Sequence, residues 1–289
     1  MELTLSVTFA VLGAALLHAA WNALIKAGRD PLLDTALVAL GGSLMALPLT
    51  LLVDAPARAS WPYIFWTVVV HIGYYTAIAA AYRIGDLSHI YPIMRGGAPL
   101  LVALASGFWF GETLTASGWA GVLLISGGVL SLAFVGRAKG RDAGGTSGKN
   151  ATTATLWALL SAAIIAVYTL IDAAGARASG GTERYVVWLF VFLGLPFGLF
   201  VLATRRGALL AHARRYWWVG VVGATCSGLS YGIALWAMTR APVAIVAALR
   251  ETSVIFAALI GAWLLKEGHL KERLVGAAAV LAGLIALKL

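Results

Sequence analysis

Apolar residues in this chain gather into ten stretches separated by short polar segments. Each stretch is close to the roughly 20 residues with which an α-helix crosses a 30 Å hydrocarbon core. The stretches are residues 6–25, 32–53, 61–82, 87–110, 116–135, 151–171, 185–203, 216–239, 243–265 and 270–287. They lack the alternation over about ten residues that is typical of membrane β-barrel strands. The pattern therefore predicts an all-α integral membrane protein with ten transmembrane helices.

The composition indicates that lipid is the solvent of this chain. Of its 289 residues, 61% are hydrophobic and 11% are charged, whereas about 25% are charged in a typical soluble domain. The basic residues behind the net charge of +9 cluster between the apolar stretches, so we expect them to face anionic lipid or cytoplasm rather than nucleic acid. The single Cys226 excludes an internal disulfide. We expect a multi-pass protein of the inner or plasma membrane.

The chain divides into two similar halves. Residues 136–150 are rich in Gly, Ser and charge, which predicts a solvated linker between a first half at 1–135 and a second at 151–289. One constant shift along the sequence places Arg95 on Arg250, Glu112 on Glu267, Gly121 on Gly276 and Gly128 on Gly283. Because each half has five predicted spans, the second enters the membrane in the opposite orientation. This predicts a 5+5 inverted-topology repeat, which points to a transporter with its site near the bilayer midplane.

Several short motifs resemble a known family. They are "AP" at Pro99 followed by "GE" at Glu112, "KE" at Lys266 and Glu267, and "LLHAAWNALIK" at residues 16–26. Together with the repeat they resemble the EamA-type branch of the drug/metabolite transporter superfamily. The resemblance implies a secondary transporter, often an exporter of amino acids or other small metabolites, with a central cavity and peripheral fifth and tenth spans. The small multidrug branch uses a glutamate in its first span, which this chain lacks.

Two arginines lie inside predicted spans. Arg95 and Arg250 are seven or eight residues from the starts of the fourth and ninth stretches, which is roughly 10–12 Å at 1.5 Å per residue. An arginine at the centre of a span costs about 2.5–3.5 kcal/mol. One interpretation is structural: the side chains snorkel, or Arg95 pairs with Glu251. The other is that both guanidinium groups bind an anionic group of a substrate.

The segment around Arg95 also contains helix-disrupting residues. Pro92, Gly96, Gly97 and Pro99 follow one another within the fourth stretch, and proline removes a helix hydrogen bond. We expect a break that exposes backbone groups to a cavity, with a simple proline kink as the alternative. The second half reads "LRETSV" around Arg250 without Pro or Gly, so a break is expected in the first half only.

Polar and aromatic residues in other spans are candidates for the same cavity, with interhelical hydrogen bonding as the alternative for each. The candidates are His18, Trp21, Asn22, His71, Tyr75, Tyr91, Tyr168, Tyr231 and Trp236. Glu251 is the one carboxylate deep in a predicted span, and Asp172 sits nearer an end. Glu251 either neutralises Arg250 or carries a coupling proton. Glu112 and Glu267 are interpreted as structural.

These observations favour a transporter over an enzyme. The sequence has no common hydrolase, nucleotide-binding or metal-binding motif, so no catalytic residue, cofactor or metal is predicted. Two deep arginines against one glutamate favour a small anionic or zwitterionic metabolite, such as an amino acid. The expected partners are that substrate, protons as a candidate coupling ion, and the bilayer, with the protein a monomer or homodimer. The alternative is a non-transporting membrane subunit or a lipid-modifying or flippase component.

The direction of transport stays open at this stage. Lys and Arg are more frequent in the connections that follow odd-numbered spans. The positive-inside rule would then place both termini outside the cytoplasm. The family resemblance implies cytoplasmic termini instead.

Overall fold

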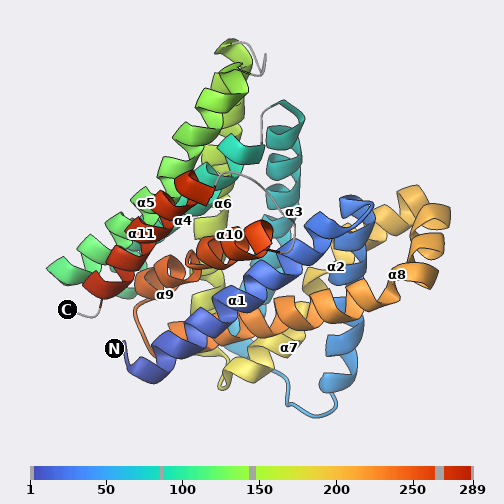
Figure 1. Ribbon diagram of the computed structural model, residues 1–289. Helices are drawn as coiled ribbons and strands as arrows, with labels where there is room; N and C mark the ends of the chain where they lie inside the picture. The colour runs from blue at the N-terminus through green and yellow to red at the C-terminus, as the bar shows by residue number, and fades with distance from the viewer. Residues whose placement is uncertain (1–2, 85–86, 143–147, 264–269, 288–289) are drawn as a thin grey trace.

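The computed structural model describes residues 3–84, 87–142, 148–263 and 270–287, and this part of the chain is helical without strands (Figure 1). Its elements are α1 (Leu5–Ala27), α2 (Pro31–Leu49), the short 3₁₀ turn η1 (Arg58–Ser60), α3 (Trp61–Ile84), α4 (Leu87–Phe110), α5 (Ala116–Asp142), α6 (Gly148–Ala178), α7 (Thr182–Leu193), α8 (Leu195–Met238), α9 (Val243–Arg250), α10 (Ser253–Trp263) and α11 (Leu270–Ala286).

Within the described residues, 6 helical stretches are long and apolar enough to cross a membrane: Leu5–Ala27, Pro31–Leu49, His89–Phe110, Ala116–Ala133, Ala151–Ala178 and Thr182–Met238. The last contains α7 and α8 and covers two of the spans predicted from sequence. In α8 the backbone leaves helical geometry at Arg205 and Tyr216, on either side of the predicted connection. The structure thus shows an all-helical membrane protein.

Helical structure also extends into the predicted linker. α5 continues to Asp142 and α6 begins at Gly148, so residues 136–150 are helical at both of their ends. The intervening residues 143–147 lie outside the described part of the chain, as does Glu267.

The expected break in the fourth span is wrong, and the structure places a break in the second half instead. α4 is continuous through Pro92 and Pro99. Gly96 is needed there for close packing, because an added Cβ would lie 2.9 Å from the Ser126 carbonyl oxygen of α5. The second half is interrupted between α9 and α10, where the amides of Glu251 and Thr252 bond to carbonyls three residues back.

A side-chain hydrogen bond contributes to this interruption. The Thr252 hydroxyl donates to the Leu249 carbonyl at 2.7 Å, and such local bonds compete with the helical ladder. No Pro or Gly marks this position in the sequence, because a polar side chain, rather than a missing amide or a missing Cβ, accompanies the end of the helix. The break leaves Arg250 at the last position of α9.

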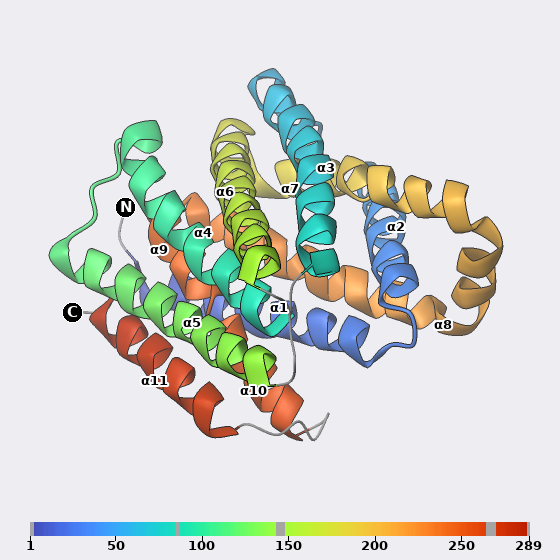
Figure 2. The same ribbon diagram turned by 90° about the horizontal axis from the view of Figure 1, so that it is seen from above.

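α9 is the central element of the bundle. Every residue from Val243 to Leu249 is buried, as expected of an apolar helix enclosed by others. In Figure 2 α9 lies beneath α4 and beside α5, and α11 packs along the outer side of α5. This arrangement holds Arg250 and Glu251 in the interior.

Candidate functional site

The predicted deep charges meet where α9 ends. Arg95 Nε lies 3.0 Å from Glu251 Oε2, and these side chains are only 10% and 5% exposed. The two charged groups are therefore in direct contact in the interior of the bundle. Arg95 Nη2 also donates to Ser253 Oγ at 3.5 Å. The contact joins α4 of the first half to the helix break of the second.

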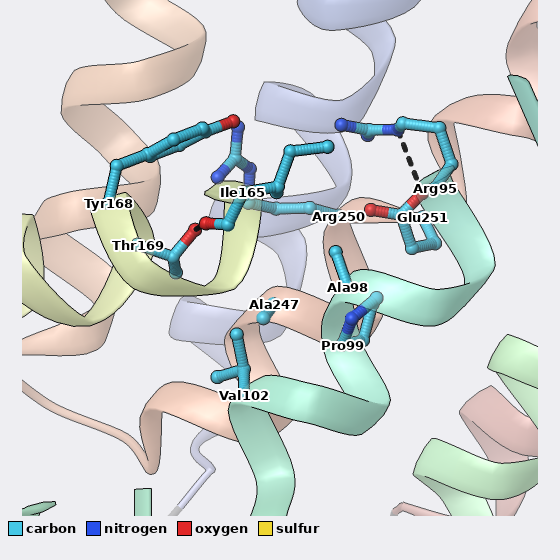
Figure 3. A pocket seen from close by; sticks show the side chains of 10 residues that line it. All are labelled: Arg95, Ala98, Pro99, Val102, Ile165, Tyr168, Thr169, Ala247, Arg250 and Glu251. Carbon is cyan, nitrogen blue, oxygen red and sulfur yellow. Dashed lines mark hydrogen bonds and ion pairs between the residues drawn. The ribbon is translucent and has the colours of Figure 1, made fainter. Parts of the chain in front are cut away.

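A small pocket lies beside this ion pair (Figure 3). Its cavity volume is about 10 Å³, which is roughly the space that one water molecule needs, and it lies between α4, α6 and α9. Its lining combines both arginines and the glutamate with small, apolar and hydroxyl-bearing residues: Arg95, Ala98, Pro99, Val102, Ile165, Tyr168, Thr169, Ala247, Arg250 and Glu251. Apolar walls with a few charged or polar groups are the usual lining of a small-molecule site, and in this structure the side chains nearly fill the space between them.

Arg250 reaches this pocket without an ion pair of its own among the described residues. Its guanidinium carbon lies 5.2 Å from the centre of the Tyr231 ring, a cation–π contact. Arg95 is thus directly neutralised by a carboxylate, whereas Arg250 rests on an aromatic face.

Asp172 is a second buried carboxylate near the site, which corrects the prediction that Glu251 is the one deep carboxylate there. Its residue is fully buried in α6. Oδ1 accepts a hydrogen bond from the Tyr185 hydroxyl at 2.7 Å, and Oδ2 accepts one from the Tyr231 hydroxyl. Thr67 adds a side-chain hydrogen bond. The carboxylate therefore connects α6 to α3, α7 and α8.

Tyr91, Tyr168 and Tyr231 are the predicted aromatic residues that the structure brings to the two arginines. Tyr91 and Tyr168 are both close enough to Arg95 to interact with it electrostatically, and Tyr168 lines the pocket. Tyr231 supports Arg250. These rings surround the charged groups with polarisable apolar surface.

The first-span candidates form a group adjoining the arginines. His18 is half-buried and interacts electrostatically with both Arg95 and Arg250. Trp21 Nε1 donates to His18 Nδ1 at 3.4 Å. Asn22 donates instead to the His18 carbonyl of its own helix at 2.7 Å.

The remaining candidates do not line the pocket. His71 packs against Tyr168 with 4.2 Å between ring centres, so it contacts the wall of the pocket. Tyr75 stacks on Phe197 of α8 at 4.8 Å. The guanidinium carbon of Arg240, an exposed residue just after α8, lies 4.4 Å from the centre of the Trp236 ring. Trp236 does not line the pocket.

Sequence reasoning missed Asp172, Ser253, Ile165 and Thr169 as members of the site. For Asp172 a signal existed: an ionisable residue inside an apolar helix marks a functional site by default. Ser253 follows two charged positions in "LRETSV". Ile165 and Thr169 carry no such signal, because small and apolar wall residues look like any other residue of a span.

Glu112 fixes the start of α9. Its Oε1 pairs with Arg177 Nη2 at 2.5 Å, and its Oε2 accepts from the Val243 amide at 2.9 Å. A carboxylate at a helix N-terminus satisfies an amide that has no helical partner and complements the helix dipole. Glu112 therefore positions the helix that carries Arg250.

Comparison with known proteins agrees with this architecture. A solved structure described as "Crystal structure of protein" matches with a TM-score of 0.69 and 19% sequence identity, covering 97% of this chain and 94% of that chain. At this identity the likeness concerns the fold. No curated protein is significantly similar to the chain.

The second half matches a protein family as well. Residues 152–289 fit the model of the EamA-like transporter family. This segment contains α9, the helix break and three of the four charged residues described above at the site, Asp172, Arg250 and Glu251. Through these residues the second half of the chain is similar to the EamA-like transporter family.

Proposed function

We propose that this protein is a secondary active transporter of a small anionic or zwitterionic metabolite, working as an exporter or exchanger in the cell membrane, with an amino acid as the first case to test. The observation that carries the proposal is the meeting of Arg95 and Arg250, one from each half, at one buried pocket. Buried arginines are costly in a membrane, and a guanidinium fork matches a carboxylate or phosphonate. The aromatic rings beside them suit an amphipathic substrate body.

The proposal includes ten spans arranged as two inverted five-helix repeats. Close glycine contacts between α5 and α11 support it. An added Cβ on Gly121 would lie 3.0 Å from the Gly283 carbonyl oxygen, and one on Gly128 would lie 3.0 Å from that of Gly276. Gly121 corresponds to Gly276 and Gly128 to Gly283 in the sequence repeat. The operation that superposes one half on the other therefore converts the Gly121–Gly283 contact into the Gly276–Gly128 contact, as a two-fold axis requires.

The Arg95–Glu251 contact supplies a route to coupling. A substrate anion that binds Arg95 competes with Glu251 for the same guanidinium. The displaced carboxylate would be buried without a partner, which is costly, so Glu251 would take up a proton. We therefore assign Glu251 the coupling proton of alternating access, exchanged each time the substrate leaves.

The test is transport by the purified protein in liposomes, preceded by a thermal-shift screen of anionic, zwitterionic and cationic metabolites. With a stabilising metabolite in hand, Arg250→Ala should lower kcat/KM by about 30-fold or more, because losing one partner of a buried charge contact costs about 2 kcal/mol or more. Arg250→Lys should recover little, since the fork is lost.

A matched control is Arg240→Ala, which removes an exposed arginine that also rests on an aromatic ring but lies outside the pocket. Normal transport by Arg240→Ala alongside loss in Arg250→Ala supports the proposal. Stabilisation by cations alone, or normal transport by both Arg95→Ala and Arg250→Ala, would show that the arginines are structural.

A further inference from the structure

The Asp172 cluster is a second buried ionisable centre close to the pocket. Both carboxylate oxygens accept hydrogen bonds from phenol hydroxyls, those of Tyr185 and Tyr231. No Lys or Arg of the described residues forms an ion pair with it. A buried carboxylate held by neutral hydroxyls keeps its hydrogen bonds in either protonation state, because a hydroxyl can donate or accept.

Tyr231 joins this carboxylate to Arg250. The Arg250 guanidinium packs against the face of the Tyr231 ring, and the Tyr231 hydroxyl donates a hydrogen bond to Asp172. Asp172 and Arg250 also interact electrostatically. Each arginine of the pocket therefore has its own carboxylate: Glu251 touches Arg95 directly, and Asp172 faces Arg250 across one ring.

Counting Asp172 changes the charge of the site. Sequence reasoning set two arginines against one carboxylate and expected a net positive cavity. With Asp172 buried there, two arginines face two carboxylates, and the site is neutral when all four are charged. An anion arriving at Arg250 then adds an uncompensated negative charge in a low-dielectric region, where such a charge is costly.

We propose that Asp172 is a second proton-binding carboxylate of the transport site, which takes up a proton when an anion occupies Arg250. The role of Asp172 in transport rests on the proposed function. Proton binding by Asp172 can be measured on the protein without a substrate. The proton comes from water and forms an O–H bond on the carboxylate. Because binding linkage is reciprocal, protonated Asp172 strengthens anion binding at Arg250 by the same factor.

Several groups face Asp172 from the surrounding helices. They are Thr67 on α3, Tyr168 on α6 itself, Tyr185 on α7, Tyr231 on α8 and Arg250 on α9. His71 lies one turn further along α3, beside Thr67 and Tyr168. Among them Arg250 is the charged residue. An anion that binds to Arg250, or leaves it, therefore changes the electrostatic environment of the Asp172 carboxylate directly.

The experiment is infrared difference spectroscopy of the ligand-free protein in liposomes, comparing pH of about 8 with about 5. A protonated carboxyl group has a C=O stretch that its carboxylate lacks. We expect a band from Asp172 that Asp172→Asn removes. Tyr231→Phe should keep the band and shift its frequency, because one hydroxyl contact is lost.

The controls are Glu251→Gln and Asp34→Asn, which remove another buried carboxylate each, the latter paired with His212 at 2.7 Å. Both should retain the Asp172 band. Absence of a buried-carboxyl band, or a band unchanged by Asp172→Asn and by Tyr231→Phe, overturns the proposal. Since no substrate is used, this result is independent of the liposome transport assay, where failure would count against the proposed function alone.

Discussion

Arg95, Arg250 and Glu251 were identified from the sequence because charged residues are rare inside apolar spans and expensive there. Their partners were harder to predict. The ion pair of Arg95 with Glu251 was one of several alternatives, since the two residues are far apart in the chain. Asp172 was set aside because the sixth span was predicted to end at residue 171, whereas α6 continues to Ala178. An error in one helix boundary thus hid a fully buried carboxylate.

At the scale of the single residue, Glu251→Gln tests the coupling assignment. The variant keeps the shape of the side chain but can no longer exchange a proton. We expect substrate-induced proton uptake in liposomes to disappear, while substrate affinity changes by less than about tenfold, or 1.4 kcal/mol, because Arg95 remains available. Glu183→Gln, at a carboxylate that is 65% exposed, is the control. Unchanged proton uptake in Glu251→Gln would favour an exchanger without proton coupling.

At the scale of the helices, the apolar pattern predicts that the chain is helical but does not predict where a helix is interrupted. Length and hydropathy predicted the helical fold, because crossing the bilayer imposes both. The helix boundaries differ in the second half, where α8 covers Leu195–Met238 and the predicted span 243–265 is divided into α9 and α10. The interruptions were predicted in the wrong half, because proline and glycine were read as breaks. In α4 the glycine serves close packing against α5. Between α9 and α10 the Thr252 hydroxyl and the charge contact of Glu251 with Arg95 hold the interruption.

The packing of α5 on α11 gives a prediction at this scale. Gly127 and Gly128 are neighbours on α5, yet an added Cβ meets nothing within 4 Å at Gly127 and lies 2.8 Å from the Ala279 Cβ at Gly128. Gly128→Ala should therefore lower stability by about 1–3 kcal/mol through overpacking. Gly127→Ala should leave it unchanged or raise it by up to about 1 kcal/mol through helix propensity. Thermal unfolding in one detergent compares them, and equal melting temperatures would contradict the α5–α11 contact.

At the scale of the whole molecule, the proposed inverted repeat would link the fold to the site. Two halves that enter a membrane in opposite orientations bring their corresponding residues to the same depth from opposite sides. Arg95 and Arg250 correspond in the repeat and line one pocket. Their surroundings differ, because Glu251 has Gly96 as its counterpart and the helix break is in one half only. If the proposed repeat holds, the asymmetry of the site arises from local sequence differences between the two halves.

The topology of this frame is open to a three-point test. In Figures 1 and 2 α1 begins and α11 ends on the same side of the molecule, and α5 ends at the top of Figure 1, away from both. Ten spans place both termini on one side of the membrane, and five spans place the segment between α5 and α6 on the other. Reporters fused at Glu2 and Leu289 should give the same answer, and one inserted at Gly144 the opposite answer. Disagreement between the two termini would contradict ten spans, and agreement of all three would contradict the inverted repeat.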